Sequence, residues 1–364
     1  MQKTANFKLG AHRPLVISGP CSAETRTQTL ETCLALAATG LVDMFRAGIW
    51  KPRTSPGSFE GVGAEGLEWM AEAKRLTGIP FGVEVASARH VEQALAAGAD
   101  AVWTGARTTV SPFAVQEVAD ALRAFSGGDR VAVLVKNPIN PDIALWTGAV
   151  ERFLAAGIPG QNIGLIHRGF SHFGQGKYRN APMWPLTFDM RGRFPGMTMI
   201  ADPSHIAGRR EYLREISQTA ADLRYDGLII ESHCRPAEAL SDAAQQITPE
   251  EFAELIKSIN WRAAATDDPE FMQSLELFRE QIDNIDDAIF DLLSRRMKIS
   301  ERIGDVKKAG DVAILQSDRW GAIRERVLSQ SLDLDLSAEF LNQILDAIHV
   351  ESIHRQNRVM NRGE

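Results

Sequence analysis

The segment PLVISGPCS, residues 14–22, joins a run of apolar and β-branched residues to a chemically active cysteine at its end. Short runs of this kind predict buried β-strands. Seven more follow it, and the eight together are residues 14–22, 44–50, 80–85, 101–107, 131–137, 162–169, 197–205 and 227–233. Most are separated by Ala-, Leu- and Glu-rich stretches that end at glycine, a pattern typical of helices. Eight strand and helix units predict an α/β fold, a closed (β/α)₈ TIM barrel.

The length leaves room for a second domain. A barrel of this type takes about 250 residues, whereas the chain has 364, of which 24% are charged and 44% hydrophobic. We therefore expect a barrel over residues 1–262, a polar linker over 263–272 and a small all-α domain over 273–364.

The residues after the linker show helical periodicity and no further strand runs. Apolar positions from Leu275 to Val306 step mostly by three or four, which predicts one long amphipathic helix to about Ala309. Two more helices are expected, from Ser317 to Ser331 and, after Ser337 as N-cap, to about Asn361.

Charge and cysteine content exclude several classes of protein. Lys and Arg number 40 against 47 Asp and Glu, for a net charge of -7, so no basic field attracts nucleic acid or an anionic membrane. No apolar run is long enough to span a membrane and no signal peptide is evident, which predicts a cytoplasmic protein. Cys21, Cys33 and Cys234 share no CxxC spacing and are expected to be free thiols or isolated ligands.

Each predicted strand ends in or next to a residue that can do chemistry. In chain order these residues are Cys21, Lys51, Glu84, Arg107, Lys136, Arg168, His205 and Glu231. A polar residue at any one strand end carries little meaning by itself. Because the carboxyl ends of barrel strands converge on one face, all eight are expected to surround a single mouth.

Part of this set is suited to a metal ion. Cys21, His205 and Glu231, with Asp242 shortly after, offer mixed sulfur, nitrogen and oxygen ligands. Such a set suits Mn, Fe, Co or Zn better than Mg or Ca, which prefer oxygen ligands. Cys21 alone could be a small buried apolar residue, but its position at a strand end favours a ligand.

The same mouth is expected to be rich in cations. These are Arg46, Lys51, Arg53, Arg107, Lys136 and Arg168. Such a cluster repels itself unless strongly anionic groups occupy it, and phosphate is the group that Arg forks and Lys charges recognise. No GxxxxGK[ST] loop is present, which favours phosphorylated small metabolites over nucleoside triphosphates.

The motifs at these strand ends resemble those of 3-deoxy-D-arabino-heptulosonate 7-phosphate (DAHP) synthases of the type I beta branch. They are GPCSAE from Gly19, RAGIWKPRTSPGSFEG from Arg46, GART from Gly105, LVKN from Leu134, HRGF from His167, DPSH from Asp202 and IIESHCRPAEALSD from Ile229. The resemblance covers roughly residues 12–260. It implies condensation of phosphoenolpyruvate with erythrose 4-phosphate, the entry step of the shikimate pathway.

The resemblance also implies roles for individual residues. It makes Cys21, His205, Glu231 and Asp242 the metal ligands, with Mn²⁺ as the expected ion and Fe, Co or Zn as alternatives. It places phosphoenolpyruvate against Arg107, Lys136 and Arg168, close to Arg46 and Lys51, and it places the sugar phosphate against Arg53 and Thr54, near Asp202. We further assign proton delivery to Lys51 and water handling to Glu84.

In the helical part, Arg296 and Lys307 are 11 residues apart and fall nearly on one helix face, whereas Arg279 does not share that face. On spacing alone, a solvated charged face is the simpler interpretation. However, residues 278–307 and ESIHRQ, residues 351–356, resemble the all-helical chorismate mutases, a likeness covering about 274–358.

This second resemblance implies a chorismate site and a dimer. Its substrate-binding positions are Arg279, Arg296, Lys307, Arg319, Ser352 and Gln356, with Arg279 supplied by the partner in an intertwined dimer. Lys307 and Gln356 would face the breaking ether oxygen, since this pericyclic reaction needs electrostatic stabilisation and no general acid or base. Gln316 and Trp320 depart from the family, which carries acidic residues there, so the activity could be modest or depend on the barrel.

We also hypothesise that the helical domain senses prephenate or chorismate and inhibits the synthase. Two alternatives remain at this stage. One is a metal-dependent sugar-phosphate aldolase with a helical dimerisation module, and the other is a metabolite-sensing scaffold without catalysis. Four retained ligand types argue against the scaffold, and two separate sets of cations argue against the aldolase.

Overall fold

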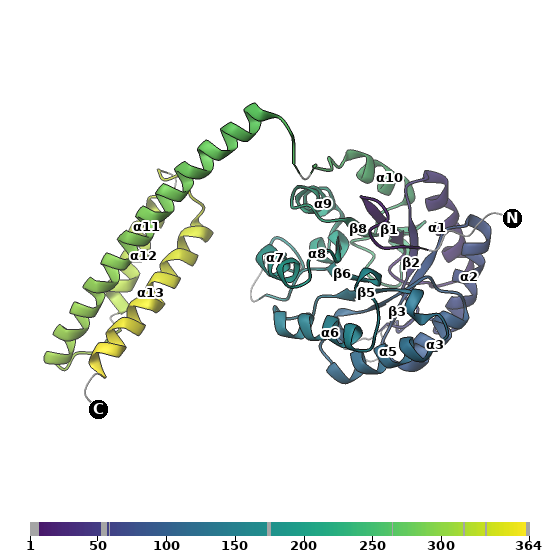
Figure 1. Ribbon diagram of the computed structural model, residues 1–364, viewed down its shortest axis with the longest axis horizontal. Helices are drawn as coiled ribbons and strands as arrows, with labels where there is room; N and C mark the ends of the chain where they lie inside the picture. The colour runs from purple at the N-terminus through teal and green to yellow at the C-terminus, as the bar shows by residue number, and fades with distance from the viewer. Residues whose placement is uncertain are drawn as a thin grey trace. The chain divides into compact units, whose positions relative to one another are not determined.

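The computed structural model describes residues 7–51, 57, 59–172, 176–263, 265–315, 317–331 and 333–361. The chain divides into two compact units, Met1–Ala264 and Ala265–Glu364. Figure 1 shows strands surrounded by helices in the first unit and helices alone in the second. The (β/α)₈ barrel and the helical domain expected from the sequence are therefore both confirmed.

The barrel consists of eight parallel strands, each hydrogen-bonded to the next, with β8 closing on β1. The strands are β1 (Leu15–Gly19), β2 (Met44–Ala47), β3 (Phe81–Val85), β4 (Ala101–Thr104), β5 (Ala132–Lys136), β6 (Ile163–His167), β7 (Thr198–Ala201) and β8 (Gly227–Glu231). Gly19 pairs with Glu231 in the closing register. This pairing brings the end of β1, and Cys21 beyond it, next to the end of β8.

Two apolar layers hold the barrel together, because alternate strand residues point inward and outward. In β1, Leu15 and Ile17 join the barrel interior with Trp103, whereas Val16 joins the larger layer between the strands and the helices. All of these side chains are buried. Burial on both faces explains why the strands are nearly continuous apolar runs in the sequence.

Helices follow the strands and cover the outside of the barrel (Figure 1). They are α1 (Arg26–Thr39), α2 (Glu65–Thr77), α3 (Ala88–Ala96), α4 (Ala106–Thr109), α5 (Pro112–Ala124), α6 (Ile143–Ala155), α7 (Trp184–Arg193), α8 (Pro203–Ala207), α9 (Leu213–Asp222) and α10 (Pro249–Ser258). Several begin at a side-chain cap, and α10 has a complete capping box between Thr248 and Glu251. None of the described helices is long and apolar enough to cross a membrane.

The second unit contains α11 (Pro269–Ala309), α12 (Ser317–Ser329) and α13 (Ala338–Met360). α13 packs along α11, and α12 packs against α13. The two long helices are close together at Gly304, where an added Cβ would lie 3.1 Å from Cα of Gln356. A residue without a side chain at this point lets the helices come together and places Gln356 against α11.

One expected boundary was wrong by several residues. The linker was expected to extend to residue 272, but α11 is helical from Pro269. The side chain of Asp268 accepts hydrogen bonds from the backbone N–H groups of Glu270 and Phe271, and Pro269 occupies the first turn. These capping features start the helix before the apolar periodicity begins at Leu275.

Candidate functional site

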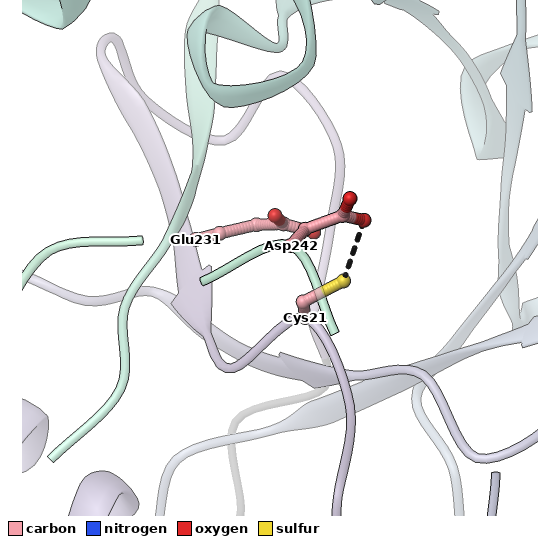
Figure 2. Close-up of side chains that lie close together, drawn as sticks. All are labelled: Cys21, Glu231 and Asp242. Atoms are coloured by element: carbon pink, nitrogen blue, oxygen red, sulfur yellow. Dashed lines mark hydrogen bonds between the residues drawn. The ribbon is translucent and has the colours of Figure 1, made fainter. Parts of the chain in front are cut away.

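Three of the four expected metal ligands lie together at the carboxyl ends of the strands. Cys21 follows β1, Glu231 ends β8, and Asp242 lies in the loop after β8. One ligand atom from each lies within 4.8 Å of the other two, and the Cys21 Sγ is 3.3 Å from Oδ2 of Asp242. Figure 2 shows these side chains converging from the three segments. The backbone of Asp242 is in the left-handed region, with φ at 48°.

The fourth expected ligand, His205, lies beside this group. It is on α8, where Oδ1 of Asp202 accepts from its backbone N–H. Its Nδ1 is 2.9 Å from Oδ2 of Asp202, and its Nε2 is 3.8 Å from Oε1 of Glu231. A carboxylate on one ring nitrogen orients the other for metal binding. Asp202 therefore turns His205 toward the three ligands.

The donor set fits a divalent transition ion. Cys21 and Glu231 are buried, and Asp242 is mostly buried. Burial raises the pKa of the Cys21 thiol to about 12, an effect that Glu231 reinforces and Lys51 opposes. A bound cation would favour the thiolate instead. Sulfur, imidazole and carboxylate donors in one buried place match the mixed ligands predicted from the sequence.

Three of the expected cations make short contacts within this site, two with buried carboxylates and one with the Cys21 thiol. The Nη1 of Arg46 is 2.6 Å from Oε1 of Glu231, and both side chains are 1% exposed. The Nζ of Lys136 is 2.9 Å from Oδ2 of Asp202, and the Nζ of Lys51 is 2.9 Å from Sγ of Cys21. The two ion pairs with Glu231 and Asp202 offset part of the repulsion between the clustered cations.

Arg168 and Arg107 have no such acidic partner among the described residues. Arg168 donates to Oδ1 of Asn180 at 2.8 Å and to the carbonyl of Gly169. Burial lowers its pKa to about 10, Asp202 offsets this only in part, and the charges of Arg179 and Arg107 add to the lowering. Arg107 is exposed on α4. Both guanidinium groups are thus available to an incoming anion.

The remaining residues predicted at the mouth have separate positions. The carboxylate of Glu84 contacts Trp103, because Nε1 of Trp103 donates a hydrogen bond to Oε2 of Glu84 at 3.2 Å. Glu84 also shares with Lys51 the wall of a cavity of about 250 Å³. Arg53 and Thr54 lie outside the described residues.

Sequence reasoning missed several residues that hold this site. Arg179 donates from Nη1 to Oδ1 of Asp242 and to Oε1 of Gln245, each at 2.9 Å. Gln245 donates to Oε2 of Glu231 at 2.6 Å. Asn137 accepts from the backbone N–H of Arg168 at 2.7 Å. Arg179 and Gln245 lie in loops beyond the strand ends, where no periodic pattern indicates which side chains turn inward.

The helical unit contains a second cavity, of about 300 Å³. Five of the residues predicted to bind chorismate line it, and they are Arg296, Lys307, Arg319, Ser352 and Gln356. No acidic side chain is among its described lining residues. Three cations without a carboxylate make this cavity suitable for a dianion.

Hydrogen bonds fix several of these side chains. Arg296 donates from Nη1 to the hydroxyl of Ser352, and Lys307 donates to the carbonyl of Ile314. The amide nitrogen of Gln356 donates to the hydroxyl of Ser300 at 3.3 Å. Its Oε1 is buried and has no partner among the described residues.

Two further lining residues, Trp320 and His349, form one wall of this cavity. Their rings are stacked, with centroids 3.9 Å apart and planes 11° apart. The sequence identified Trp320 as a departure from the mutase pattern but gave no reason to single out His349, which lies on a different helix. Gln316, the second departure, lies outside the described residues.

Arg279 does not line the cavity within its own chain. It lies in the first half of α11, where its guanidinium is 3.8 Å from Glu276 and its side chain is 60% exposed. The same half of α11 exposes many large apolar side chains, among them Leu277, Phe278, Ile282, Ile285 and Ile289. This face of α11 is not covered by the described part of the chain.

Comparison with known families separates the chain into the same two parts. A model of the DAHP synthetase I family matches residues 2–265. A model described as chorismate mutase type II matches residues 278–357.

Individual relatives match the barrel. A phospho-2-dehydro-3-deoxyheptonate aldolase of Thermotoga maritima is 30% identical over 260 residues, which are 71% of this chain and 73% of the relative. A 2-dehydro-3-deoxyphosphooctonate aldolase of Geobacter sp. strain M21 is 29% identical over 276 residues, 69% of this chain and 93% of the relative.

The crystal structure of the phospho-2-dehydro-3-deoxyheptonate aldolase, a DAHP synthase, from Thermotoga maritima has the same fold over much of the chain. It matches with a TM-score of 0.61 at 30% identity, covering 69% of this chain and 70% of that one. A truncated form of the 3-deoxy-D-arabino-heptulosonate 7-phosphate synthase from the same organism matches with a TM-score of 0.58 at 26% identity, covering 69% and 87%.

Proposed function

The chain belongs to the DAHP synthetase I family and carries a C-terminal chorismate mutase type II domain, and on this basis we propose how each of its two sites works. The enzyme combines DAHP synthase and chorismate mutase activities in one chain. At the barrel mouth, the proposed substrates are phosphoenolpyruvate and erythrose 4-phosphate. In the helical cavity, the proposed substrate is chorismate and the product prephenate.

The cations without acidic partners support the binding of phosphoenolpyruvate. The guanidinium groups of Arg168 and Arg107 have no acidic partner among the described residues, and the buried Lys136 adds a point charge from the end of β5. Lys136 now contacts Asp202, so an arriving anion shares a cation that is already held in position. The three groups bind and orient the enol phosphate, which gives its methylene carbon one direction of attack. Arg53 and Thr54 are proposed to hold the phosphate of the sugar.

The buried ligand set supports a divalent metal, for which we propose Mn²⁺, with Fe, Co and Zn as alternatives. Cys21, Glu231 and Asp242 would hold it, with His205 as the fourth ligand. Such an ion supplies Lewis-acid polarisation of the aldehyde oxygen. Arg46 and Gln245 each bind one oxygen of Glu231, and Arg179 binds one oxygen of Asp242, so these residues keep the carboxylates in place.

Lys51 is the proposed proton donor to the aldehyde oxygen. Burial lowers the pKa of its ammonium group, but the nearby Cys21 and Glu231 more than offset this, and the net pKa is raised. Lys51 therefore carries its proton at neutral pH, 2.9 Å from one metal-ligand atom. As the enol carbon attacks the aldehyde, this proton neutralises the oxygen. Water then adds to the cationic carbon and phosphate leaves, with Glu84 as the proposed group that orients the water.

The helical cavity supports the mutase reaction by charge alone. Arg296 and Arg319 are proposed to bind the two carboxylates of chorismate, while Lys307 and Gln356 face the ether oxygen that gains negative charge as its bond breaks. Prearranged donors around a developing charge are sufficient for this class of reaction. The observation that favours an anionic ligand here is the lining itself, in which Arg296, Lys307 and Arg319 stand without a described acidic residue.

Dimerisation is proposed to complete this cavity. The uncovered apolar face of α11 suits a second copy of the chain, and Arg279 lies on that half of the helix. A closed two-fold dimer would place each Arg279 at the cavity of the other chain.

The proposed feedback inhibition of the synthase uses the same cavity. Prephenate retains both carboxylates of chorismate and would be the effector that binds there.

The second candidate for the barrel is a different aldose acceptor. It is favoured by the relative named 2-dehydro-3-deoxyphosphooctonate aldolase. An eight-carbon product made from three-carbon phosphoenolpyruvate requires a five-carbon aldose phosphate, whereas a seven-carbon product requires a four-carbon one.

One set of assays separates these possibilities. Phosphate release from phosphoenolpyruvate is measured with erythrose 4-phosphate or arabinose 5-phosphate, with and without EDTA, while chorismate loss is followed separately. We expect release with the four-carbon sugar only, its loss with EDTA and its return with Mn²⁺, and chorismate loss that EDTA does not affect. Release with the five-carbon sugar only would favour the octonate activity, and release unaffected by EDTA would remove the metal from the proposal.

The feedback proposal is tested in the full chain. Prephenate should inhibit phosphate release by the wild-type enzyme and should fail to inhibit the Arg296→Ala variant. Equal inhibition of both would place the effector site outside the helical cavity.

A further inference from the structure

A basic cavity of about 530 Å³ lies at the amino-terminal end of the barrel, opposite the catalytic mouth. Its walls include Thr198, the first residue of β7, and Asp226, which immediately precedes β8. Since the candidate metal ligands follow the other ends of the strands, this cavity is separate from the site described above.

Three arginines from distant parts of the chain line this cavity. They are Arg13 from the segment before β1, Arg191 near the end of α7, and Arg224 between α9 and β8. The one acidic lining residue described, Asp226, accepts from the backbone N–H of Met199 at 2.8 Å and lies 4.0 Å from Arg191. One carboxylate against three guanidinium groups leaves a local excess of positive charge.

Two of the arginines also have structural contacts. Arg13 donates from Nε to the carbonyl of Tyr225 and from Nη1 to that of Arg262. Arg191 donates to the carbonyls of Leu223 and Arg224. Because these bonds join loops at the barrel end, a purely structural role would account for Arg13 and Arg191.

That structural role does not account for Nη2 of Arg13 or for the guanidinium group of Arg224. Nη2 of Arg13 is buried and has no hydrogen-bond partner among the described residues. The side chain of Arg224 makes no described hydrogen bond or ion pair. Its backbone is in the left-handed region, with φ at 61°. Burial lowers the pKa of Arg13, and the charges of Arg224 and Arg191 add to this against the opposing effect of Asp226. The three groups thus repel one another, and Asp226 is the one described acidic residue in the lining to offset them.

We propose that this cavity binds a small oxyanion, a phosphate or carboxylate metabolite, between Arg13, Arg191 and Arg224. The anion would accept from Nη2 of Arg13 and from the guanidinium of Arg224, so that it satisfies an orphaned donor and relieves the repulsion. The mouth and the helical cavity take anions as substrates, whereas this site holds one that does not react.

Equilibrium dialysis of the full chain against inorganic phosphate, and separately against malonate, tests this site. The Arg224→Gln variant removes one charge where the side chain makes no bond that the fold requires. The control is Arg123→Gln, which makes the same charge change at an exposed position on α5. Circular dichroism and phosphate release from phosphoenolpyruvate should be unchanged in both variants, because neither residue lies at the mouth.

We expect wild type and Arg123→Gln to bind equally, and Arg224→Gln to lose one class of site or weaken it at least tenfold. Loss with phosphate alone identifies a phosphate ligand, and loss with malonate identifies a carboxylate. Arg224→Gln binding both anions as tightly as Arg123→Gln, or no saturable anion binding that depends on Arg224, would overturn the proposal. These outcomes do not depend on whether the barrel uses a four- or a five-carbon sugar.

Discussion

The Nζ atom of Lys51 lies 2.9 Å from the Sγ atom of Cys21. The proposed proton donor and a proposed metal ligand are therefore in direct contact before any substrate is present. Because the two groups are so close, loss of the thiol should impair both metal binding and proton delivery by Lys51. The helical cavity should not be affected.

Replacing Cys21 by Ala is expected to abolish phosphate release from phosphoenolpyruvate and to leave chorismate conversion unchanged. Loss of one ligand should lower Mn²⁺ affinity by more than about a hundredfold, a larger effect than loss of a residue that only supports a ligand. Isothermal titration with Mn²⁺ measures this directly.

The matched control is Cys33→Ala, which removes another buried free thiol, one that is outside the metal group. It should retain Mn²⁺ binding and both activities. Tight Mn²⁺ binding by Cys21→Ala would show that the thiol is not a ligand.

Arg296→Ala should reduce kcat/KM for chorismate by at least about a hundredfold, the usual effect of removing one prearranged donor from a developing charge. Arg302→Ala changes an exposed arginine on the same helix that does not line the cavity, and it should behave as wild type. Steady-state kinetics on both variants check this, and comparable losses would point to a general effect of charge rather than to substrate binding.

A mixing experiment tests whether Arg279 acts across a dimer. Arg279→Ala and Arg296→Ala chains should each be nearly inactive as mutases. The two variants are unfolded together and refolded as an equal mixture, so that half of the dimers contain one chain of each kind. Each mixed dimer has one intact site out of two. About a quarter of wild-type activity should therefore return. Activity no higher than that of the separate variants would place Arg279 at its own chain's site or outside the reaction.

His349 should make chorismate binding depend on pH. Burial and then Arg296 lower the pKa of its imidazole from 6.5, while Asp346 acts the other way. A bound dicarboxylate favours the protonated ring and raises this pKa, so affinity should increase as the pH falls below 6.5, where the substrate carboxylates are still ionised.

The measurement is KM for chorismate between pH 5 and pH 8 in wild type and in His349→Asn. The variant should have a flatter profile. If the two profiles coincide, protonation of His349 does not contribute to binding.

Much of the candidate chemistry could be predicted because residue type and strand position carry it. A barrel brings every strand end to one mouth, so Cys21 and Glu231 could be placed together although 210 positions separate them. The spacing of Arg296 and Lys307 placed them on one helix face but favoured a solvated surface, and only the resemblance to the chorismate mutases predicted a cavity, on whose wall the structure has both. The contacts of Arg179 with Asp242 and Gln245 could not be predicted, because loop conformation has no periodic signal in the sequence.

The sequence by itself determined the alternating buried runs that close into a barrel, the separate helical domain, and the kinds of side chain at each strand end. These follow from burial patterns and residue chemistry, which are local properties of the chain. Only the tertiary structure decided which charges meet. Lys136 contacts Asp202, whereas Arg224 approaches Arg13 without a described partner, because these distances depend on how loops far apart in the sequence pack at the two ends of the barrel.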